Sequence, residues 1–229
     1  MSLPKPYYQD SAVTLYHGDC REIVPELPKG LTISDPPYNV GYHYGSYSDR
    51  MNPKAYQQML ASVCRTPCVL IHYMESLCDF AFSVEELPAK VVAWVYPSNT
   101  PRQWRGIAWW GCTPDFTKDC QDYKNPTDKR IAERIANGER ARLYDWWEIN
   151  QVKNIGEEKT DHPCQIPLLV MARILKITDG DLVIDPFMGS GTTLRAAKDA
   201  GRKAIGIEID EAYCEIAARR MGQEVLQFT

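Results

Sequence analysis

Short apolar runs alternate with helical patterns along most of this 229-residue chain, and this alternation constrains the fold more than any other feature. Alternating strands and helices are typical of a doubly wound, mostly parallel α/β sheet. We predict strands over residues 13–17, 31–34, 68–72, 91–96, 107–112 and 203–208, with another that begins at residue 182. We predict helices over residues 53–64, 74–87, 126–137, 166–175 and 211–221.

The length and composition fit one domain with a modest insertion. A charged share of 24% and a hydrophobic share of 44% are those of an ordinary soluble protein. The apolar runs are too short to span a membrane and the first residues lack the apolar core of a signal peptide, so we expect a cytoplasmic protein. Eight cysteines without Cys-x-x-Cys spacing argue against a metal site and against a disulfide framework.

One turn carries groups that could hold an amine. Asp35-Pro36-Pro37-Tyr38 directly follows the apolar run 31–34. The Asp35 carboxylate and the Pro36 carbonyl could each accept one hydrogen of an amino group on a flat base, and the Tyr38 ring could stack on that base. Two successive prolines stiffen such a turn. Taken alone, a Pro-Pro turn at a strand end is more often structural, so the assignment needs a second motif.

Residues 182–193 supply that motif, because they are expected to form a strand, a glycine-rich turn and the start of a helix. Nucleotide-like cofactors bind at this place in open α/β sheets. Glycines let the backbone approach a ligand, and the helix start offers free N–H groups. Leu194 stands where the dinucleotide fingerprint would have its third glycine, so that fingerprint is absent. Glu208 ends the next predicted strand, where an acid can bind ribose hydroxyls.

Together the two motifs resemble those of DNA amino-methyltransferases that use S-adenosyl-L-methionine. The catalytic motif precedes the cofactor motif, as in the circularly permuted β class of that family. The segments Leu15-Tyr16-His17-Gly18-Asp19 and His162-Pro163-Cys164-Gln165 also match. The resemblance implies a Rossmann-like methyltransferase sheet with a catalytic half (1–97), a last strand plus a small target-recognition region (98–154) and a cofactor-binding half (155–229).

The same resemblance assigns roles to individual residues. The implied catalytic residues are Asp35, Pro36, Pro37 and Tyr38. The implied cofactor-binding residues are Asp19, Cys20, Asp35, His162, Gln165, Asp185, Phe187, Met188, Gly189, Ser190, Gly191, Thr192, Thr193, Glu208 and Ile209.

The middle of the chain is the predicted DNA-binding region. Residues 98–142 contain nine Lys or Arg against six Asp or Glu, in a chain whose net charge is −4. Asn125 is the expected cap of the helix over 126–137, with Ile131 and Ile135 on its buried face. Candidate contacts to base edges lie in the expected loop before residue 107, and candidate contacts to phosphates lie beyond it. These candidates are Arg102, Gln103 and Arg105, followed by Lys124, Lys129, Arg130 and Arg134. The six tryptophans are expected to be packed.

The resemblance implies methyl transfer to an exocyclic amine of a base flipped out of double-stranded DNA, and Asp35 favours adenine N6 over cytosine N4. Cytosine-N4 methylation remains an alternative. Less favoured are an RNA or protein-glutamine methyltransferase and a noncatalytic DNA-binding regulator.

Pro163-Cys164-Gln165 imitates the nucleophile motif of cytosine carbon-5 methyltransferases. Here it precedes the cofactor motif, so we interpret Cys164 as structural. We expect no metal and no membrane partner. The sequence leaves open a homodimer and a cognate restriction endonuclease.

Overall fold

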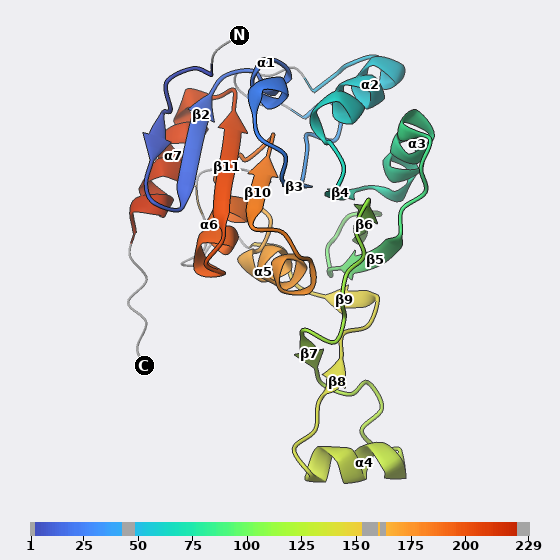
Figure 1. Ribbon diagram of the computed structural model, residues 1–229. Helices are drawn as coiled ribbons and strands as arrows, with labels where there is room; N and C mark the ends of the chain where they lie inside the picture. The colour runs from blue at the N-terminus through green and yellow to red at the C-terminus, as the bar shows by residue number, and fades with distance from the viewer. Residues whose placement is uncertain (1–2, 43–48, 153–159, 161–163, 224–229) are drawn as a thin grey trace.

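The computed structural model describes residues 3–42, 49–152, 160 and 164–223. Its main sheet has the order β1-β2-β11-β10-β3-β4-β6-β5-β9, and β7 pairs with β8 separately (Figure 1). The strands are β1 (Tyr8–Gln9), β2 (Val13–His17), β3 (Leu31–Ser34), β4 (Cys68–His72), β5 (Lys90–Val95), β6 (Trp104–Trp110), β7 (Cys120–Gln121), β8 (Ala141–Arg142), β9 (Trp146–Glu148), β10 (Leu182–Asp185) and β11 (Lys203–Glu208). The helices are α1 (Cys20–Ile23), the 3₁₀ turn η1 (Val24–Glu26), α2 (Pro53–Val63), α3 (Met74–Val84), α4 (Lys129–Ala136), α5 (Leu168–Ile177), α6 (Thr192–Asp199) and α7 (Glu211–Gly222).

The predicted mostly parallel, doubly wound sheet is confirmed. Strands β2, β11, β10, β3 and β4 are parallel neighbours. Strand β6 runs antiparallel between β4 and β5. The chain moves from β10 to β11 on one side and from β3 to β4 on the other, so β10 and β3 flank the point where the strand order reverses. Ligands bind at such a switch point in open α/β sheets.

Helices cover both faces of this sheet. In β4, Val69 and Ile71 belong to the core cluster that includes α5, α6 and α7. Cys68 and Leu70, which alternate with them along the strand, belong to the cluster that includes residues of α1, α2 and α3. Because both faces are buried, β3 and β4 consist mainly of apolar residues, and even their polar Thr32, Ser34 and His72 are buried. The predicted bounds of β2, β3, β4 and β11 match the structure. Within the described ranges, no helix has the length and apolarity needed to cross a bilayer.

An arm carrying β7, β8 and α4 leaves the sheet between β6 and β9 (Figure 1). At one end of the arm, Trp110 of β6 pairs with Cys68, the first residue of β4. At the other end, the Asp145 carboxylate lies 2.9 Å from Nζ of Lys90, the first residue of β5. Both ends therefore leave from the edge where the parallel strands begin. Ser34 and Asp185 end their strands at the opposite edge.

The structure corrects two expectations about this region. The cap of α4 is Asp128, which accepts a hydrogen bond from the Arg130 N–H at 2.9 Å, and not Asn125. The expected buried face is also wrong, since α4 has no buried residue and Ile135 is 43% exposed. The arm extends away from the sheet, and Ile131 is only partly buried (Figure 1).

Four tryptophans are fully buried as expected: Trp94, Trp109, Trp110 and Trp147. The expectation is wrong for Trp104 and Trp146, which are 43% and 41% exposed. The Trp146 ring instead carries the Lys124 ammonium at 4.4 Å from its centre.

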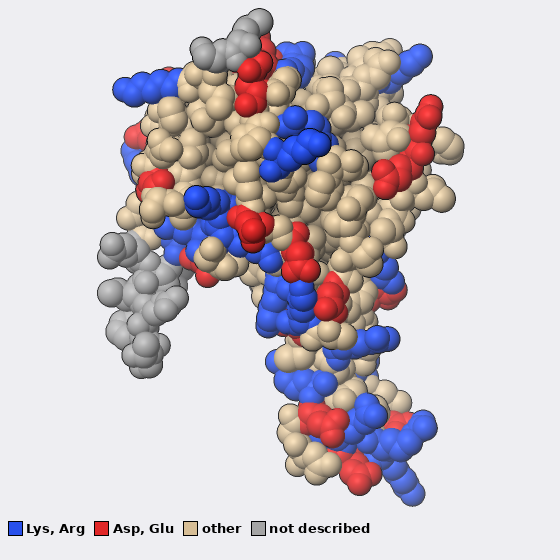
Figure 2. All heavy atoms as spheres, in the orientation of Figure 1, with Lys and Arg blue, Asp and Glu red and all other residues tan. Residues whose placement is uncertain are grey.

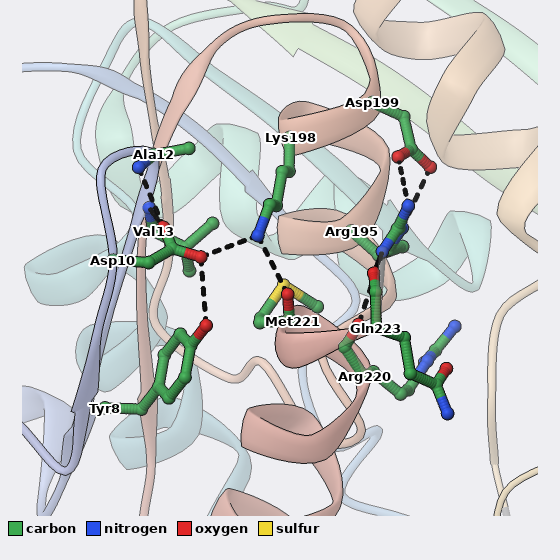
Figure 3. Close-up of polar contacts among 10 residues, drawn as sticks. All are labelled: Tyr8, Asp10, Ala12, Val13, Arg195, Lys198, Asp199, Arg220, Met221 and Gln223. Atoms are coloured by element: carbon green, nitrogen blue, oxygen red, sulfur yellow. Dashed lines mark hydrogen bonds and ion pairs between the residues drawn. The ribbon is translucent and has the colours of Figure 1, made fainter. Parts of the chain in front are cut away.

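Side chains of α6 hold the end of α7 in place (Figure 3). Lys198 Nζ donates to the Met221 carbonyl at 2.8 Å and to the Asp10 carboxylate at 2.6 Å. Arg195 donates to the Gln223 carbonyl at 2.7 Å. The last carbonyls of a helix lack partners within the helix and favour nearby cations. These contacts therefore fix α7 both to α6 and to the turn between β1 and β2.

We predict that Lys198→Met destabilises the protein by about 1–2 kcal/mol at pH 7. Burial alone would raise the pKa of Asp10. Hydrogen bonds from Lys198 and from the Ala12 and Val13 N–H groups outweigh this effect and lower the pKa to about 2. A carboxyl with a lowered folded-state pKa stabilises the fold above its unfolded pKa and loses that contribution as pH falls. Urea unfolding should show the difference from wild type shrinking by about 1 kcal/mol at pH 3. An unchanged difference at pH 3, or an equal loss in the exposed control Lys5→Met, would contradict this role.

Candidate active site

The turns after β3 and β10 are held together by one buried hydrogen bond. Val183 and Ile184 of β10 pair with Leu31 and Thr32 of β3. Beyond this pairing, Ser34 Oγ donates to Asp185 Oδ1 at 2.6 Å. The same oxygen accepts the Phe187 N–H at 3.0 Å. Burial raises the pKa of Asp185, and these hydrogen bonds oppose that shift. Asp185 therefore joins the two predicted motifs.

A cavity of about 250 Å³ lies where the two turns meet. Its lining includes ten of the residues assigned to the catalytic and cofactor sites: Asp19, Cys20, Asp35, Pro36, Pro37, Tyr38, Phe187, Gly189, Glu208 and Ile209. The structure thus brings both motifs into one site.

Seven other assigned residues are buried outside that lining: Gln165, Asp185, Met188, Ser190, Gly191, Thr192 and Thr193. Arg220 ties part of this group together, since its Nη1 donates to the Ser190 carbonyl at 2.8 Å and to Thr192 Oγ1 at 3.1 Å. Such contacts shape the glycine-rich turn. The assignment of His162 falls outside the described residues.

A chain of hydrogen bonds fixes the Pro-Pro turn from behind. The Tyr73 N–H donates to Nδ1 of His72 at 2.8 Å, so the proton of the neutral imidazole is on Nε2. Nε2 lies 2.8 Å from the Tyr56 hydroxyl, which donates to the Pro37 carbonyl at 2.5 Å. Burial, together with the charges of Arg105 and Arg102, lowers the pKa of His72 to about 3. The imidazole therefore stays neutral and keeps its donor.

Tyr38 contacts Asp35, the carboxylate predicted to accept a hydrogen of the amine. Its hydroxyl donates to Asp35 Oδ1 at 2.5 Å. Its ring stacks on His72 with centres 4.2 Å apart and planes inclined by 23°. Burial raises the pKa of Asp35 to about 6, while Arg105 and the Tyr38 hydroxyl oppose the rise. Asp35 is thus mostly ionised at neutral pH, the state in which a carboxyl group only accepts hydrogens.

The position of Arg105 differs from the predicted loop. Arg105 belongs to β6 and lines the cavity, with its guanidinium carbon 4.9 Å from the centre of the Tyr38 ring. The alternation of Arg105, Ile107 and Trp109 along one face of β6 is the signal that could have found it. His72, Tyr56 and Tyr73 were also missed, because only long-range contacts bring them to the site.

The other candidate DNA contacts are all exposed. Arg102 lies 3.2 Å from the Glu75 carboxylate and 4.2 Å from the centre of the Tyr73 ring. Gln103 donates to the Ser98 carbonyl at 3.0 Å. The remaining candidates, Lys124, Lys129, Arg130 and Arg134, lie on the arm.

Glu208 faces the other part of the cavity. Its carboxylate accepts the Gly189 N–H at 3.0 Å and the Asp210 N–H at 2.9 Å. Burial raises its pKa to about 7 despite these hydrogen bonds. An acceptor at this strand end, beside the apolar walls of Phe187 and Ile209, suits the hydroxyls and flat ring of an adenosine. The residues present therefore fit S-adenosylmethionine.

Asp19 also lines the cavity, where it caps α1. Its carboxylate accepts the Arg21 N–H at 2.9 Å and forms an ion pair with the Arg21 guanidinium. The hydrogen bond from that side chain lowers the pKa of Asp19. Asp19 is therefore ionised, and it lines the cavity just beyond the end of β2, where His17 pairs with Glu208 of β11.

Comparisons with known proteins identify the family. The family model described as "DNA methylase", of the N6/N4 type, matches residues 30–219. The type II methyltransferase M.ScaI of Streptomyces caespitosus is 30% identical, with 97% of this chain and 86% of that protein covered. The DNA adenine methyltransferase YhdJ of Escherichia coli is 25% identical, with coverage of 93% and 84%.

Solved structures show the same fold. The cytosine-N4-specific PvuII DNA methyltransferase has a TM-score of 0.70 at 19% identity, with 97% of this chain and 91% of that chain covered. The complex of M1.HpyAVI with S-adenosylmethionine has a TM-score of 0.61 at 23% identity, with coverage of 92% and 100%. The chain therefore belongs to the N6/N4 family of DNA methylases, which use S-adenosylmethionine as methyl donor.

Proposed function

We propose that this DNA methyltransferase transfers the methyl group to N6 of adenine in a base rotated out of double-stranded DNA. The observation that carries the proposal is the presence of Asp35 and Glu208 in one cavity, so that an amine acceptor and a cofactor acceptor share a site. Aspartate at the first catalytic position is typical of adenine enzymes in this family. Rotating the base out of the stack costs a few kcal/mol.

The reaction needs the amine to become a better nucleophile, because its lone pair is delocalised into the ring. Asp35 and the Pro36 carbonyl would each accept one amine hydrogen and favour a lone pair directed at the methyl group. S-adenosylmethionine supplies that methyl group in electrophilic form. The amine then loses one proton, for which the Asp35 carboxylate is an acceptor. Tyr38 would release Asp35 and stack on the base.

The cofactor would lie between the turns after β10, β11 and β2. Glu208 would accept its ribose hydroxyls, with Phe187 and Ile209 packing on its apolar surface. Asp19, Cys20 and Gly189 complete the lining, and the buried residues of the glycine-rich turn hold that backbone in place. The role of His162 remains a sequence-based prediction.

We predict that Asp35→Ala lowers the methylation rate by at least about 100-fold, because the amine loses its charged acceptor. S-adenosylmethionine binding, measured by calorimetry, should change little. Mass spectrometry of nucleosides from DNA of cells expressing the wild-type protein should detect N6-methyldeoxyadenosine, and sequencing of modified bases should give the site. Full activity of the variant would disprove the role of Asp35, and N4-methyldeoxycytidine alone would disprove the adenine assignment.

Cofactor affinity should depend on pH through Glu208. With a pKa of about 7, Glu208 is mostly protonated at pH 6 and mostly ionised at pH 8. The ionised carboxylate is the stronger acceptor for ribose hydroxyls, so affinity should rise about tenfold from pH 6 to pH 8. In Glu208→Gln, binding should be weaker and this dependence should disappear. A variant with the wild-type pH dependence would show that another group titrates.

We further propose that Lys129, Arg130 and Arg134 of the arm contact phosphates. Figure 2 shows Lys and Arg interspersed with Asp and Glu on the arm. Attraction of DNA phosphates would therefore come from individual cations, and not from a uniformly basic surface. Both ends of the arm leave from the edge opposite Asp35. These contacts would therefore involve duplex away from the flipped base.

Replacing Lys129, Arg130 and Arg134 together by alanine should weaken DNA binding equally for target and non-target duplexes. The slope of log affinity against log salt should decrease by about 2–3, since each phosphate contact contributes about 0.9. A matched control replaces Lys5, Lys29 and Lys203, three exposed lysines outside the arm. Equal slopes for both variants would exclude the arm from DNA binding.

A further inference from the structure

Arg105 brings hydrogen-bond donors to the cavity that holds Asp35. Its buried Nε has no hydrogen-bond partner, and no ion pair joins Arg105 to a carboxylate within the described chain. An unsatisfied buried donor is costly, and a buried cation more so. This arrangement is therefore expected to have a partner that arrives with the substrate.

Three aromatic rings surround the guanidinium, and one of them, Tyr96, also forms a hydrogen bond with it. The guanidinium carbon lies 4.9 Å from the centre of the Tyr38 ring, 5.3 Å from that of Trp94 and 5.6 Å from that of Tyr96. Cations are attracted to aromatic faces at such distances. Trp94 and Tyr96 are buried in the core, so the support is rigid. Arg105 is thus held in a fixed position at the cavity, and its Nε has no hydrogen-bond partner in the described chain.

We propose that Arg105 donates a hydrogen bond to the ring nitrogen beside the methylated amine of the flipped base. This inference rests on the proposed function, in which Asp35 and the Pro36 carbonyl accept the amine hydrogens. Adenine N1 and cytosine N3 are acceptors adjacent to that amine. Asp35 and Arg105 interact electrostatically across the same cavity, so an acceptor and a donor are offered to neighbouring atoms of one base edge.

Such a contact would give Arg105 a role in specificity. Guanine N1 and thymine N3 carry a hydrogen, so they would present a donor to a donor. The ring nitrogen of adenine is also more basic than the amine. A hydrogen bond from Arg105 would occupy its lone pair and leave the amine as the nucleophile that faces the methyl group.

The test uses a DNA duplex that carries the target site, with the target adenine replaced by 1-deazaadenine. This analogue keeps the amine and lacks the N1 acceptor. For the wild-type enzyme we expect kcat/KM to fall about 10- to 100-fold on the analogue, the worth of a hydrogen bond to a charged donor. Arg105→Met should be slow on both duplexes, so that the ratio of kcat/KM on the adenine duplex to kcat/KM on the analogue is near one. Arg105→Lys keeps a donor and should retain part of the discrimination.

Arg102→Met is the matched control, because Arg102 also lies over a tyrosine ring but is exposed and paired with Glu75. It should keep the wild-type ratio between the two duplexes, whatever its affinity for DNA. A purely electrostatic role of Arg105 on Asp35 predicts that Arg105→Met also keeps the wild-type ratio, and that result would overturn the proposal. Absence of discrimination in the wild-type enzyme would overturn it too.

Two further measurements keep the outcomes separate. If modified-base sequencing identifies cytosine as the target, the adenine assignment fails, and 3-deazacytosine takes the place of 1-deazaadenine in the same comparison. If Arg105→Met does not bind S-adenosylmethionine or does not unfold cooperatively, Arg105→Lys decides. In that case, if Arg105→Lys shows the same ratio of kcat/KM between the two duplexes as the wild type, the result counts against the proposal. Lysine lacks the rigid donor fork of arginine, so it should not reproduce a contact that depends on that geometry.

Discussion

The site depends on the parallel pairing of β3 with β10 and on the hydrogen bond from Ser34 to Asp185 that continues it. These two residues are 151 positions apart in the chain. Because the carboxyl ends of neighbouring parallel strands lie side by side, the catalytic turn after β3 must meet the cofactor turn after β10. The order of the two motifs along the chain is therefore irrelevant to the site. A permuted sequence assembles the same cavity as long as these strands remain neighbours.

Residues buried on both faces of the sheet could be predicted from the sequence, whereas residues fixed by distant contacts could not. Every residue of β3 and β4 is buried and apolar residues predominate in them, so their bounds follow from local composition. The helix α4 follows a local pattern too, but its burial depends on a neighbour that the arm does not have. Arg105 falls in a predicted loop because the predicted strand begins only at residue 107, whereas β6 begins at Trp104. Its place beside Asp35 follows only from the antiparallel pairing of β6 with β4 and β5.

Three carboxyl groups near the two turns behave differently because their surroundings differ. Asp185 accepts hydrogen bonds from Ser34, Thr193 and the Phe187 N–H, and it joins the motifs. Among the described residues, only backbone N–H groups donate to Glu208, and burial raises its pKa to about 7, which suits an acceptor for uncharged hydroxyls. Asp35 has a cation nearby, and Arg105 opposes the effect of burial on its pKa. The environment thus keeps the proposed amine acceptor ionised while leaving the proposed ribose acceptor close to its titration point.

The contact between Tyr38 and Asp35 explains how a buried carboxylate can remain satisfied before DNA binds. The tyrosine hydroxyl donates to Asp35 Oδ1, which is the kind of contact that an amine hydrogen would make. Entry of the base would exchange one hydrogen bond for another, so Asp35 need not lose a partner on the way to the reactive complex. The ring of Tyr38 already stacks on His72, which burial keeps neutral and whose Nδ1 accepts the Tyr73 N–H. Release of the hydroxyl would therefore leave a supported aromatic ring beside the amine site, where a flat base can stack on it.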